Sequence, residues 1–307
     1  MKRESGLLLT LIILVAAMSV LSPYFLRTGN LLGLTRHLAE VGIIACAMTC
    51  IIATSGIDLS VGSLLGLTSI ALGYASLAWN PASGIAIAFA TGLLGGLFNG
   101  ALIAHFALPP LVVTLATMAL FRGLAMTISQ AQPVSDFAPI FDWIGQGTTA
   151  FIPTQLWIWC IVYATSWVVL ERTGYGRYLR AIGDNSQAAR AATLPVKRVL
   201  LSAYAAMGLL CALAGIVYTA RVSTARADAG TGLELEVITA VVLGGTSITG
   251  GRASLVGTLL GVLILGVVRN GASLAGVPSV WQAIIAGVIL IAAAALNHRL
   301  TDRGTAH

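Results

Sequence analysis

Long apolar runs cover most of the chain, and only one long stretch is polar. That stretch, ERTGYGRYLRAIGDNSQAARAATLPVKR, runs from Glu171 to Arg198 and contains eight Lys, Arg, Asp and Glu residues. Over the whole chain 9% of residues are charged and 57% are apolar, whereas about 25% are charged in soluble domains. Such a chain cannot build a water-facing surface. Because backbone polar groups must be satisfied inside lipid, the runs predict an all-α polytopic membrane protein.

The apolar runs predict about ten transmembrane helices, in a single transmembrane domain that covers residues 1–307. A span needs about 20 apolar residues. The predicted spans are Leu7–Leu21, Leu38–Ala53, Val61–Trp79, Gly84–Ala104, Leu111–Ser129, Pro153–Leu170, Leu200–Ala220, Val237–Ile248, Leu255–Val268 and Val280–Asn297. The shortest three, Leu38–Ala53, Val237–Ile248 and Leu255–Val268, are candidates for half-helices that face protein or a cavity.

The charges between the spans predict the orientation. Short basic loops stay in the cytoplasm, and the polar segment carries six basic residues against two acidic ones. An even number of spans places both termini on the same side as this segment. The other basic residues on that side are Lys2, Arg3, Arg252, Arg299 and Arg303. We therefore predict cytoplasmic N and C termini, and an outer loop from Gln130 to Ile152 that faces an external partner.

The polar segment contains a short predicted helix. Asp184-Asn185-Ser186 can cap a helix that begins at Gln187, and Pro195 is expected to end it. A short capped helix on the cytosolic side of a membrane protein fits a docking surface. It equally fits a solvated connector, and composition does not separate the two.

Several kinds of chemistry find no support in the sequence. The Gly-rich run Gly244 to Arg252 lacks the Gly-Lys-Ser/Thr ending of a phosphate loop, and neither Lys2 nor Lys197 follows a Gly-rich turn. The cysteine pair Cys46 and Cys50 lies in an apolar run, which favours packing over metal binding. The four histidines form no cluster. We predict no enzymatic activity, no metal site and no cofactor bound by this chain.

Few ionisable residues lie in or near the spans. Asp58, between two spans, can cap a helix that starts near Ser60, and neither Glu40 nor Glu236 is convincingly central. Ion-coupled carriers usually place acids or His at mid-membrane, so this pattern weighs against secondary transport.

Arg122 is the one basic residue well inside an apolar run. Its side chain can extend to the outer face, pair with an acid, or line a polar path with Thr114 and Thr117.

Two short patterns recur and suggest two related halves. VGSLLGL at Val61–Leu67 recurs as VGTLLGV at Val256–Val262, and Asn99-Gly100-Ala101 recurs as Asn270-Gly271-Ala272. The separation from the first pattern to the second differs between the copies, so one copy carries an extra span or the match is partly chance.

Glycine pairs at four-residue spacing predict close helix packing more than ligand contact. The pairs are Gly62/Gly66, Gly92/Gly96 and Gly257/Gly261.

Three motifs together resemble the ribose-type permease family of ATP-binding-cassette importers. They are TSGIDLSVGSLLGLT (Thr54–Thr68), GYGRYLRAIGDNSQAAR (Gly174–Arg190) and AGTGLELEVITAVVLGGTSITGGRASLVGTLLG (Ala229–Gly261). The autoinducer-2, rhamnose and galactoside permeases are close relatives in that family. The resemblance runs from about Leu21 to the last span.

The resemblance implies a monosaccharide importer in a bacterial inner membrane. It implies a fold like that of the vitamin B12 importer (a type II importer), a second permease subunit in a homodimer or heterodimer, and a periplasmic sugar-binding protein. A separate cytoplasmic ATPase would use the ATP and dock on the coupling loop, residues 171–198. The docking residues implied are Gly183, Asp184, Asn185, Ala188, Ala189 and Arg190. One departure is Thr193-Leu194, where relatives usually have Gly-Ile, and it puts the geometry of the helix exit in doubt.

A sugar path needs hydroxyl, amide and backbone groups instead of ions. The candidates are Asn99, Thr114, Thr117, Asn270 and Ser273. Such residues also bridge membrane helices without touching a ligand.

Two other functions stay open. One is an ion-coupled secondary sugar carrier that uses Asp58 or Arg122. The other is an importer of the same superfamily for autoinducer-2 or branched-chain amino acids. An amino acid would need partners for its ammonium and carboxylate groups, and the predicted spans show no evident pair. The sequence names neither the sugar nor the composition of the dimer.

Overall fold

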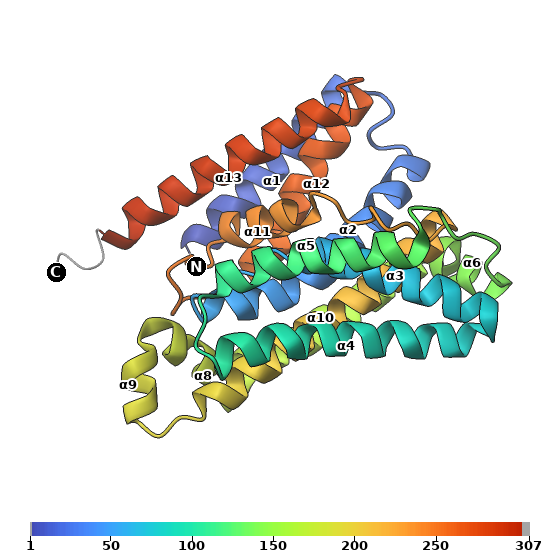
Figure 1. Ribbon diagram of the computed structural model, residues 1–307. Coiled ribbons are helices and arrows are strands. Elements are labelled where there is room, and N and C mark those ends of the chain that lie inside the picture. Colours follow the sequence, from blue (N-terminus) through green and yellow to red (C-terminus); the bar gives the residue numbers. More distant parts are fainter. Residues whose placement is uncertain (1, 303–307) are drawn as a thin grey trace.

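The computed structural model describes residues 2–302, which form a bundle of helices (Figure 1). Met1 and residues 303–307, with Arg303 among them, lie outside the described residues. Within the described part, the sheet structure is limited to one hairpin of β1 (Thr148–Thr149) and β2 (Ile152–Pro153).

Seven helices within residues 2–302 are long and apolar enough to cross a membrane. They are α1 (Lys2–Leu21), α2 (Thr28–Ala53), α3 (Val61–Ala78), α4 (Pro81–Ala104), α5 (Pro110–Ser129), α10 (Val196–Val222) and α12 (Leu255–Leu274). The prediction of an all-α polytopic membrane protein is confirmed.

The remaining helices are shorter or end the chain. They are α6 (Pro139–Gln146), α7 (Thr154–Trp167), α8 (Gly174–Asp184), α9 (Ser186–Ala191), α11 (Leu233–Leu243) and α13 (Ser279–Asp302). The predicted span Pro153–Leu170 corresponds to α7 and the π-helical turn η1 (Val168–Arg172) that follows it directly.

The half-helix interpretation holds for one of its three candidates. Helix α11 has 11 residues, too few to cross a bilayer. The candidates Leu38–Ala53 and Leu255–Val268 are wrong as half-helices, because they belong to α2 and α12, of 26 and 20 residues. In both, the helix continues through polar residues that the apolar run does not include.

Helix α2 forms the centre of the bundle. Its residues from Leu38 to Ala53 are buried almost without interruption, against α7, α10, α11 and α12. A helix that is apolar on all sides is buried in this way. The polar groups of α2 and of the loop after it are therefore held inside protein.

Two of the three spaced glycine pairs bring helices into backbone contact. A Cβ atom at Gly208 would lie 2.0 Å from the carbonyl oxygen of Gly92, and one at Gly96 would lie 2.2 Å from that of Tyr204. Helices α4 and α10 therefore touch along their backbones. Gly257 likewise faces the carbonyl oxygen of Gly244 at the end of α11, so close helix packing is confirmed for these two pairs. It is wrong for Gly62/Gly66, which face carbonyl oxygens of Gly230 and Ala227 in loop 223–232.

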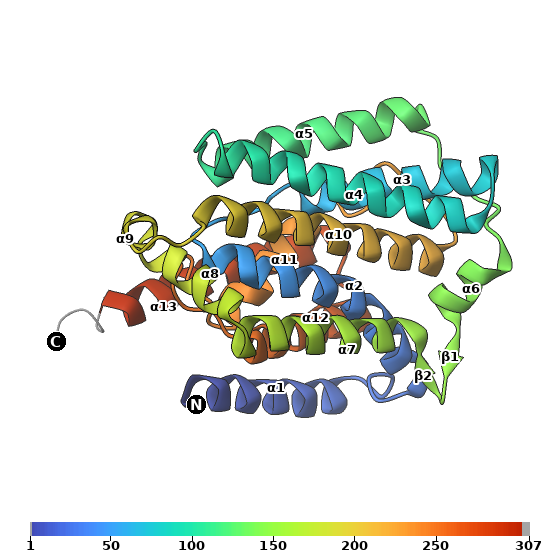
Figure 2. The same cartoon turned by 90° about the horizontal axis from the view of Figure 1, so that it is seen from below.

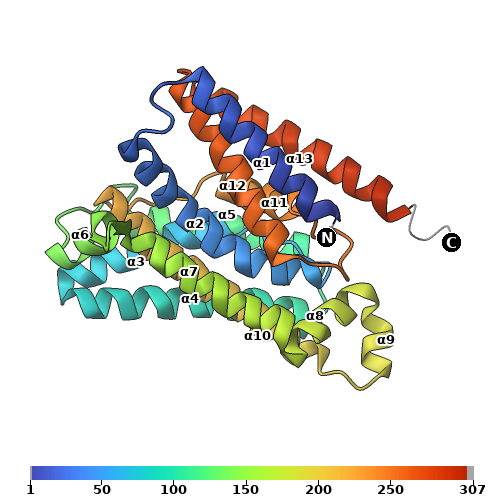
Figure 3. The same ribbon diagram turned by 180° about the vertical axis from the view of Figure 1, so that it is seen from behind.

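The two ends of the bundle differ. Helices α8 and α9, the start of α1 and the end of α13 lie at one end, and α6 with the β hairpin lies at the other (Figures 1 and 2). On one flank α1 packs along α12, beside α13 (Figure 3). We call the end with α8 and α9 the α9 end, and the opposite one the α6 end.

The two Asn-Gly-Ala segments occupy different places, so they are not equivalent parts of a repeat. In the first copy, VGSLLGL begins α3 and Asn99 lies near the end of the next helix, α4. In the second copy, Val256 and Asn270 lie toward opposite ends of the single helix α12. The motifs that start α3 and α12 do share a position after a helix and a loop.

Candidate functional site

The polar segment folds into two helices, α8 and α9, of which sequence reasoning found only the second. The side chain of Asn185 accepts hydrogen bonds from the backbone N–H groups of Gln187 (3.0 Å) and Ala188 (2.9 Å). The predicted cap is therefore confirmed, with Asn185 as the residue that provides it. The helix begins one residue earlier than expected, at Ser186.

The predicted end of this helix at Pro195 is wrong. Helix α9 ends at Ala191, where the N–H of Thr193 donates to Arg190 and the N–H of Leu194 donates to Ala189. These are the two hydrogen bonds of a Schellman turn, whose central residue adopts a left-handed conformation. Thr193 has a φ of +62° there, although a β-branched side chain disfavours positive φ.

The six predicted docking residues divide into two groups. Gly183 and Ala189 are buried against the rest of the protein. The exposed members are Asp184, Asn185, Ala188 and Arg190. One face of the segment is thus available to a partner, and the other attaches it to the bundle.

The attachment is a junction of the end of α8 with two loops. A Cβ atom at Gly183 would lie 1.9 Å from the carbonyl oxygen of Ala53, so only glycine fits. The hydroxyl of Ser55 lies 2.9 Å from the carbonyl oxygen of Gly183 and 2.6 Å from that of Thr249. The N–H of Gly251 donates to Ala53 (3.1 Å). Loops 54–60 and 244–254 therefore meet at Gly183.

Helix α8 is also tied to α10. The hydroxyl of Tyr175 lies 2.9 Å from that of Ser202, and burial raises the pKa of this phenol above its usual value. A displacement of α8 would therefore be transmitted directly to the membrane helix α10.

Loop 54–60 leads from this junction into a buried polar cluster. The carboxylate of Asp58, which is 1% exposed, accepts from the N–H (2.9 Å) and the hydroxyl (2.6 Å) of Ser60. The predicted cap by Asp58 is wrong: Ser60 precedes α3 and the helix has no side-chain cap, because the Asp58 carboxylate accepts the N–H of Ser60 and not one within the helix. The amide of Asn99 donates to the Ser60 hydroxyl (2.9 Å), and Thr114 donates to the carbonyl oxygen of Ile57 (3.1 Å).

The predicted path residues fall into separate groups. Asn99 and Thr114 belong to the buried cluster, and Thr117 lies one turn farther along α5. Asn270 instead exchanges hydrogen bonds with Asn30 of α2. Ser273 is exposed. The structure does not bring all five together.

Arg122 binds backbone oxygen atoms near the α6 end. It donates to the carbonyl groups of Ala227 and Ala229 in loop 223–232, at 3.0 Å for the second. This agrees with a side chain that extends toward one end of its span. It places Arg122 away from a polar path with Thr114 and Thr117.

A cavity of about 710 Å³ opens near the α6 end. It lies between α2, α10, α11, α12 and α13, beside loop 223–232. Five ionisable residues on four of these helices line it: His37, Glu40, Arg221, Glu236 and Arg269. We call it the charged cavity.

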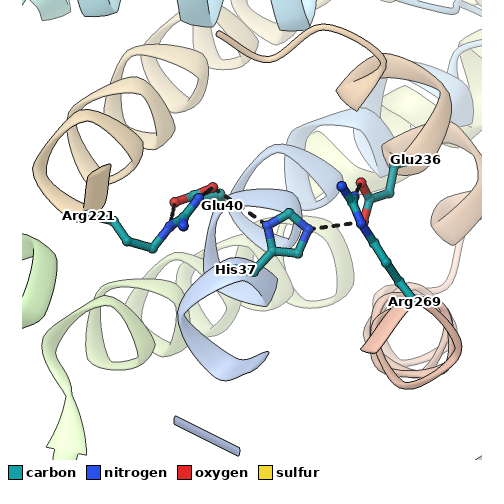
Figure 4. Close-up of polar contacts among 5 residues, drawn as sticks. All are labelled: His37, Glu40, Arg221, Glu236 and Arg269. Carbon is teal, nitrogen blue, oxygen red and sulfur yellow. Dashed lines mark hydrogen bonds and ion pairs between the residues drawn. The ribbon is translucent and has the colours of Figure 1, made fainter. Parts of the chain in front are cut away.

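These five residues form a chain of polar contacts across the cavity (Figure 4). Arg221 binds both carboxylate oxygens of Glu40, from Nε to Oε1 at 2.6 Å and from Nη2 to Oε2 at 3.1 Å. Arg269 pairs with Glu236. Between the two carboxylates lies His37, with Nδ1 3.9 Å from Glu40 and Nε2 3.4 Å from Glu236.

Sequence reasoning missed this cluster because the partners are distant in the chain. Glu40 is 181 residues from Arg221, and Glu236 is 33 residues from Arg269. The available signal was His37 with Glu40, at i and i+3 on one helix, beside an apolar run. The predicted spans showed no evident acid–base pair because Arg221, Glu236 and Arg269 each lie just outside the predicted bounds. The helices that carry them extend past those bounds and bring two such pairs to this cavity.

An exposed pair lies beside the charged cavity in loop 223–232. Arg226 donates two hydrogen bonds to Asp228, at 2.9 and 2.8 Å. The guanidinium holds the pKa of the Asp228 carboxyl below its usual value. Asp228 also lines the cavity, so the rim of the cavity is charged too.

Comparisons with known proteins agree over nearly the whole chain. The chain is 40% identical to the ribose import permease protein RbsC of Escherichia coli (strain K12) over 301 residues, which are 96% of this chain and 94% of that protein. It is 40% identical to RbsC of Bacillus subtilis (strain 168), covering 97% and 93%. The fructose import permease protein FrcC of Rhizobium meliloti is 35% identical, covering 95% and 84%.

No solved structure matches the chain. The family model described as "Branched-chain amino acid transport system / permease component" matches residues 30–294. Together with the apolar helices, this match agrees with the resemblance seen in the three sequence motifs. The chain is a multi-pass membrane permease that belongs to this family of transport-system permease components.

Proposed function

We propose that the chain is the membrane subunit of an ATP-binding-cassette importer that carries a monosaccharide, a ribose-like pentose or a hexose, into the cytoplasm. The observation that carries the proposal is the 40% identity to ribose import permeases over 96% of the chain. A relative named for fructose import supports a sugar over other cargo.

The energy comes from a partner in this proposal. A cytoplasmic ATPase uses the ATP and docks on the exposed face of α9, and this chain binds no cofactor. The junction at Gly183 supports the arrangement, because a movement of α8 and α9 would pass directly to loops 54–60 and 244–254. The buried cluster around Asp58 lies on the first of these loops.

The remaining assembly follows the family. We infer a vitamin B12 importer-like arrangement with ten spans and two related halves. It would contain a second permease subunit and receive sugar from a periplasmic binding protein. The α9 end would face the cytoplasm of a bacterium, with the chain in the inner membrane. The basic residues of segment 171–198 support this orientation.

Transport in proteoliposomes tests the proposal. Vesicles would hold this chain with its partner ATPase, and the binding protein would be added outside. We expect ATP-dependent uptake of labelled D-ribose or D-fructose, unchanged by a protonophore. Uptake that needs a proton or sodium gradient and no ATPase would instead establish the ion-coupled carrier.

Paired substitutions test the docking face. Ala188→Asp with Arg190→Glu changes two exposed residues of α9 and should prevent copurification of the ATPase. Arg27→Glu makes a similar charge change at an exposed position between α1 and α2, at the opposite end of the bundle, so it should leave copurification intact. Normal copurification and uptake in the double variant would contradict the docking assignment.

An amino-acid importer is the second candidate. The description of the matching family model, a branched-chain amino acid transport system permease component, is the observation that favours it. Each compound would be tested with its own binding protein. ATP-dependent uptake of L-leucine, without uptake of D-ribose or D-fructose, would establish this alternative. An importer of autoinducer-2, the cargo named for a 35% identical permease, is tested by including that compound in the same panel.

A further inference from the structure

The charged cavity is separate from the junction at Gly183 and from the buried cluster at Asp58. Its lining residues come from the ends of α2, α10, α11 and α12 that lie away from α9, and from α13. We propose that this cavity is the outer receiving site, where a neutral polyhydroxylated molecule enters the permease. The inference rests on the proposed function and adds the residues that contact the sugar.

The dimensions suit a small ligand. Ligand pockets usually measure about 300–1,000 Å³ and combine apolar walls with a few converging polar groups. This cavity of about 710 Å³ is larger than one monosaccharide needs. Its apolar walls include Tyr218, Leu265, Val268 and Ile285, which can contact the C–H faces of a sugar ring.

The arrangement of charge favours a neutral ligand. Each carboxylate is already paired with an arginine, so an ion entering the cavity would have to separate a pair. Separating such a pair is unfavourable, because a buried carboxylate is then left without its partner. A hydroxyl group can instead use the lone pairs and N–H groups that remain free in each pair.

Exposure identifies the residues that a ligand can reach. The side chain of Arg269 is 46% exposed, and those of His37 and Arg221 are 28% and 27% exposed. Glu40 and Glu236, at 3% and 13%, lie behind them. An ion pair that only stabilised the fold would not need to face an open cavity. We therefore assign the contacts to Arg269, His37 and Arg221, with the two glutamates as positioning residues.

Cysteine protection tests the site in the membrane complex of the permease with its ATPase. Cys160, the exposed native cysteine, and the partly buried Cys50 would first be replaced by serine. Ala272 lines the cavity, whereas the adjacent Ser273 is exposed but does not line it. Ala272→Cys and Ser273→Cys therefore form a matched pair for labelling by a membrane-impermeant thiol reagent. The binding protein is omitted.

We expect D-ribose or D-fructose at high concentration to slow labelling at position 272 and not at position 273. Arg269→Gln should weaken this protection about tenfold or more, since hydrogen bonds to charged groups contribute about 1.5–3 kcal/mol. Should Arg269→Gln fail to fold, His37→Gln gives the same readout from α2. Unchanged protection in a folded variant would overturn the residue assignment.

The outcomes separate this inference from the proposed function. ATP-dependent sugar uptake with no protection at position 272 would overturn the receiving site and leave the importer assignment intact. Protection by sugar without any ATP-dependent uptake would support the site and contradict the importer. Protection by L-leucine and by neither sugar would contradict the proposal that the cavity receives a neutral ligand.

Discussion

The hydroxyl of Ser55 lies 2.9 Å from the carbonyl oxygen of Gly183. This contact joins the loop that follows the central helix α2 to the last turn of α8. The same hydroxyl lies 2.6 Å from the carbonyl oxygen of Thr249, on the loop before α12. A single side chain therefore links the polar segment to the loops that follow α2 and precede α12, in addition to the contact of Tyr175 with Ser202 of α10.

Gly183→Ala should uncouple the segment from the bundle. The new methyl group would lie 1.9 Å from the carbonyl oxygen of Ala53, so the junction has to open. We expect sugar uptake in the reconstituted importer to fall severalfold more than ATP hydrolysis. The control is Gly174→Ala in the same helix, which should be tolerated because a Cβ atom at Gly174 meets only Arg177, at 3.6 Å. Equal effects of the two substitutions would show that the junction does not transmit movement.

Thr193→Gly should stabilise the protein. Thr193 has a φ of +62°, and a left-handed conformation costs a residue with a side chain roughly 1–2 kcal/mol, of which glycine is largely free. Because glycine also loses more conformational entropy on folding, the net gain in the free energy of unfolding should be about 1 kcal/mol. The midpoint of thermal unfolding in detergent should rise. The control is Ala192→Gly, at a φ of −78°, which should lower the midpoint. A lower midpoint for Thr193→Gly would contradict the Schellman turn.

Glu40→Gln should destabilise the fold far more than a comparable change at the surface. Glu40 is 3% exposed, and its loss leaves Arg221 without its partner, at a cost of about 3–5 kcal/mol. Asp228→Asn breaks a pair whose side chains are 53–55% exposed and screened by solvent, so it should change the free energy of unfolding very little. Chemical denaturation of both variants measures the difference. Adding Arg221→Gln to Glu40→Gln should restore part of the loss, and a purely additive result would exclude coupling between the two.

Asp58→Asn should leave uptake independent of the proton gradient. The asparagine oxygen can still accept the backbone N–H of Ser60, so the start of α3 should persist with a modest loss of stability. We expect uptake at constant ATP to be insensitive to a protonophore in both proteins. If the protonophore inhibited uptake by the wild-type protein but not by Asp58→Asn, Asp58 would be identified as a coupling site.

Local patterns predicted the elements whose cause is local. Asn185 caps α9 because a side-chain oxygen two or three residues before an N–H group can reach it in any fold. Two of the three glycine pairs predicted close helix packing, because a missing Cβ always removes the steric barrier to a neighbouring helix. The exit of α9 was predicted wrongly, since a Schellman turn at Thr193 ends the helix before Pro195.

The sequence alone determined that the chain is a helical membrane permease, because apolar runs and family motifs are properties of composition and local order. Only the tertiary structure decided which distant residues meet. Arg221 and Glu40 pair across 181 residues, and Asn99 and Asn270 lie apart despite identical local motifs. The physical reason is that long-range pairing depends on helix packing and loop paths, which no short stretch of residues encodes by itself.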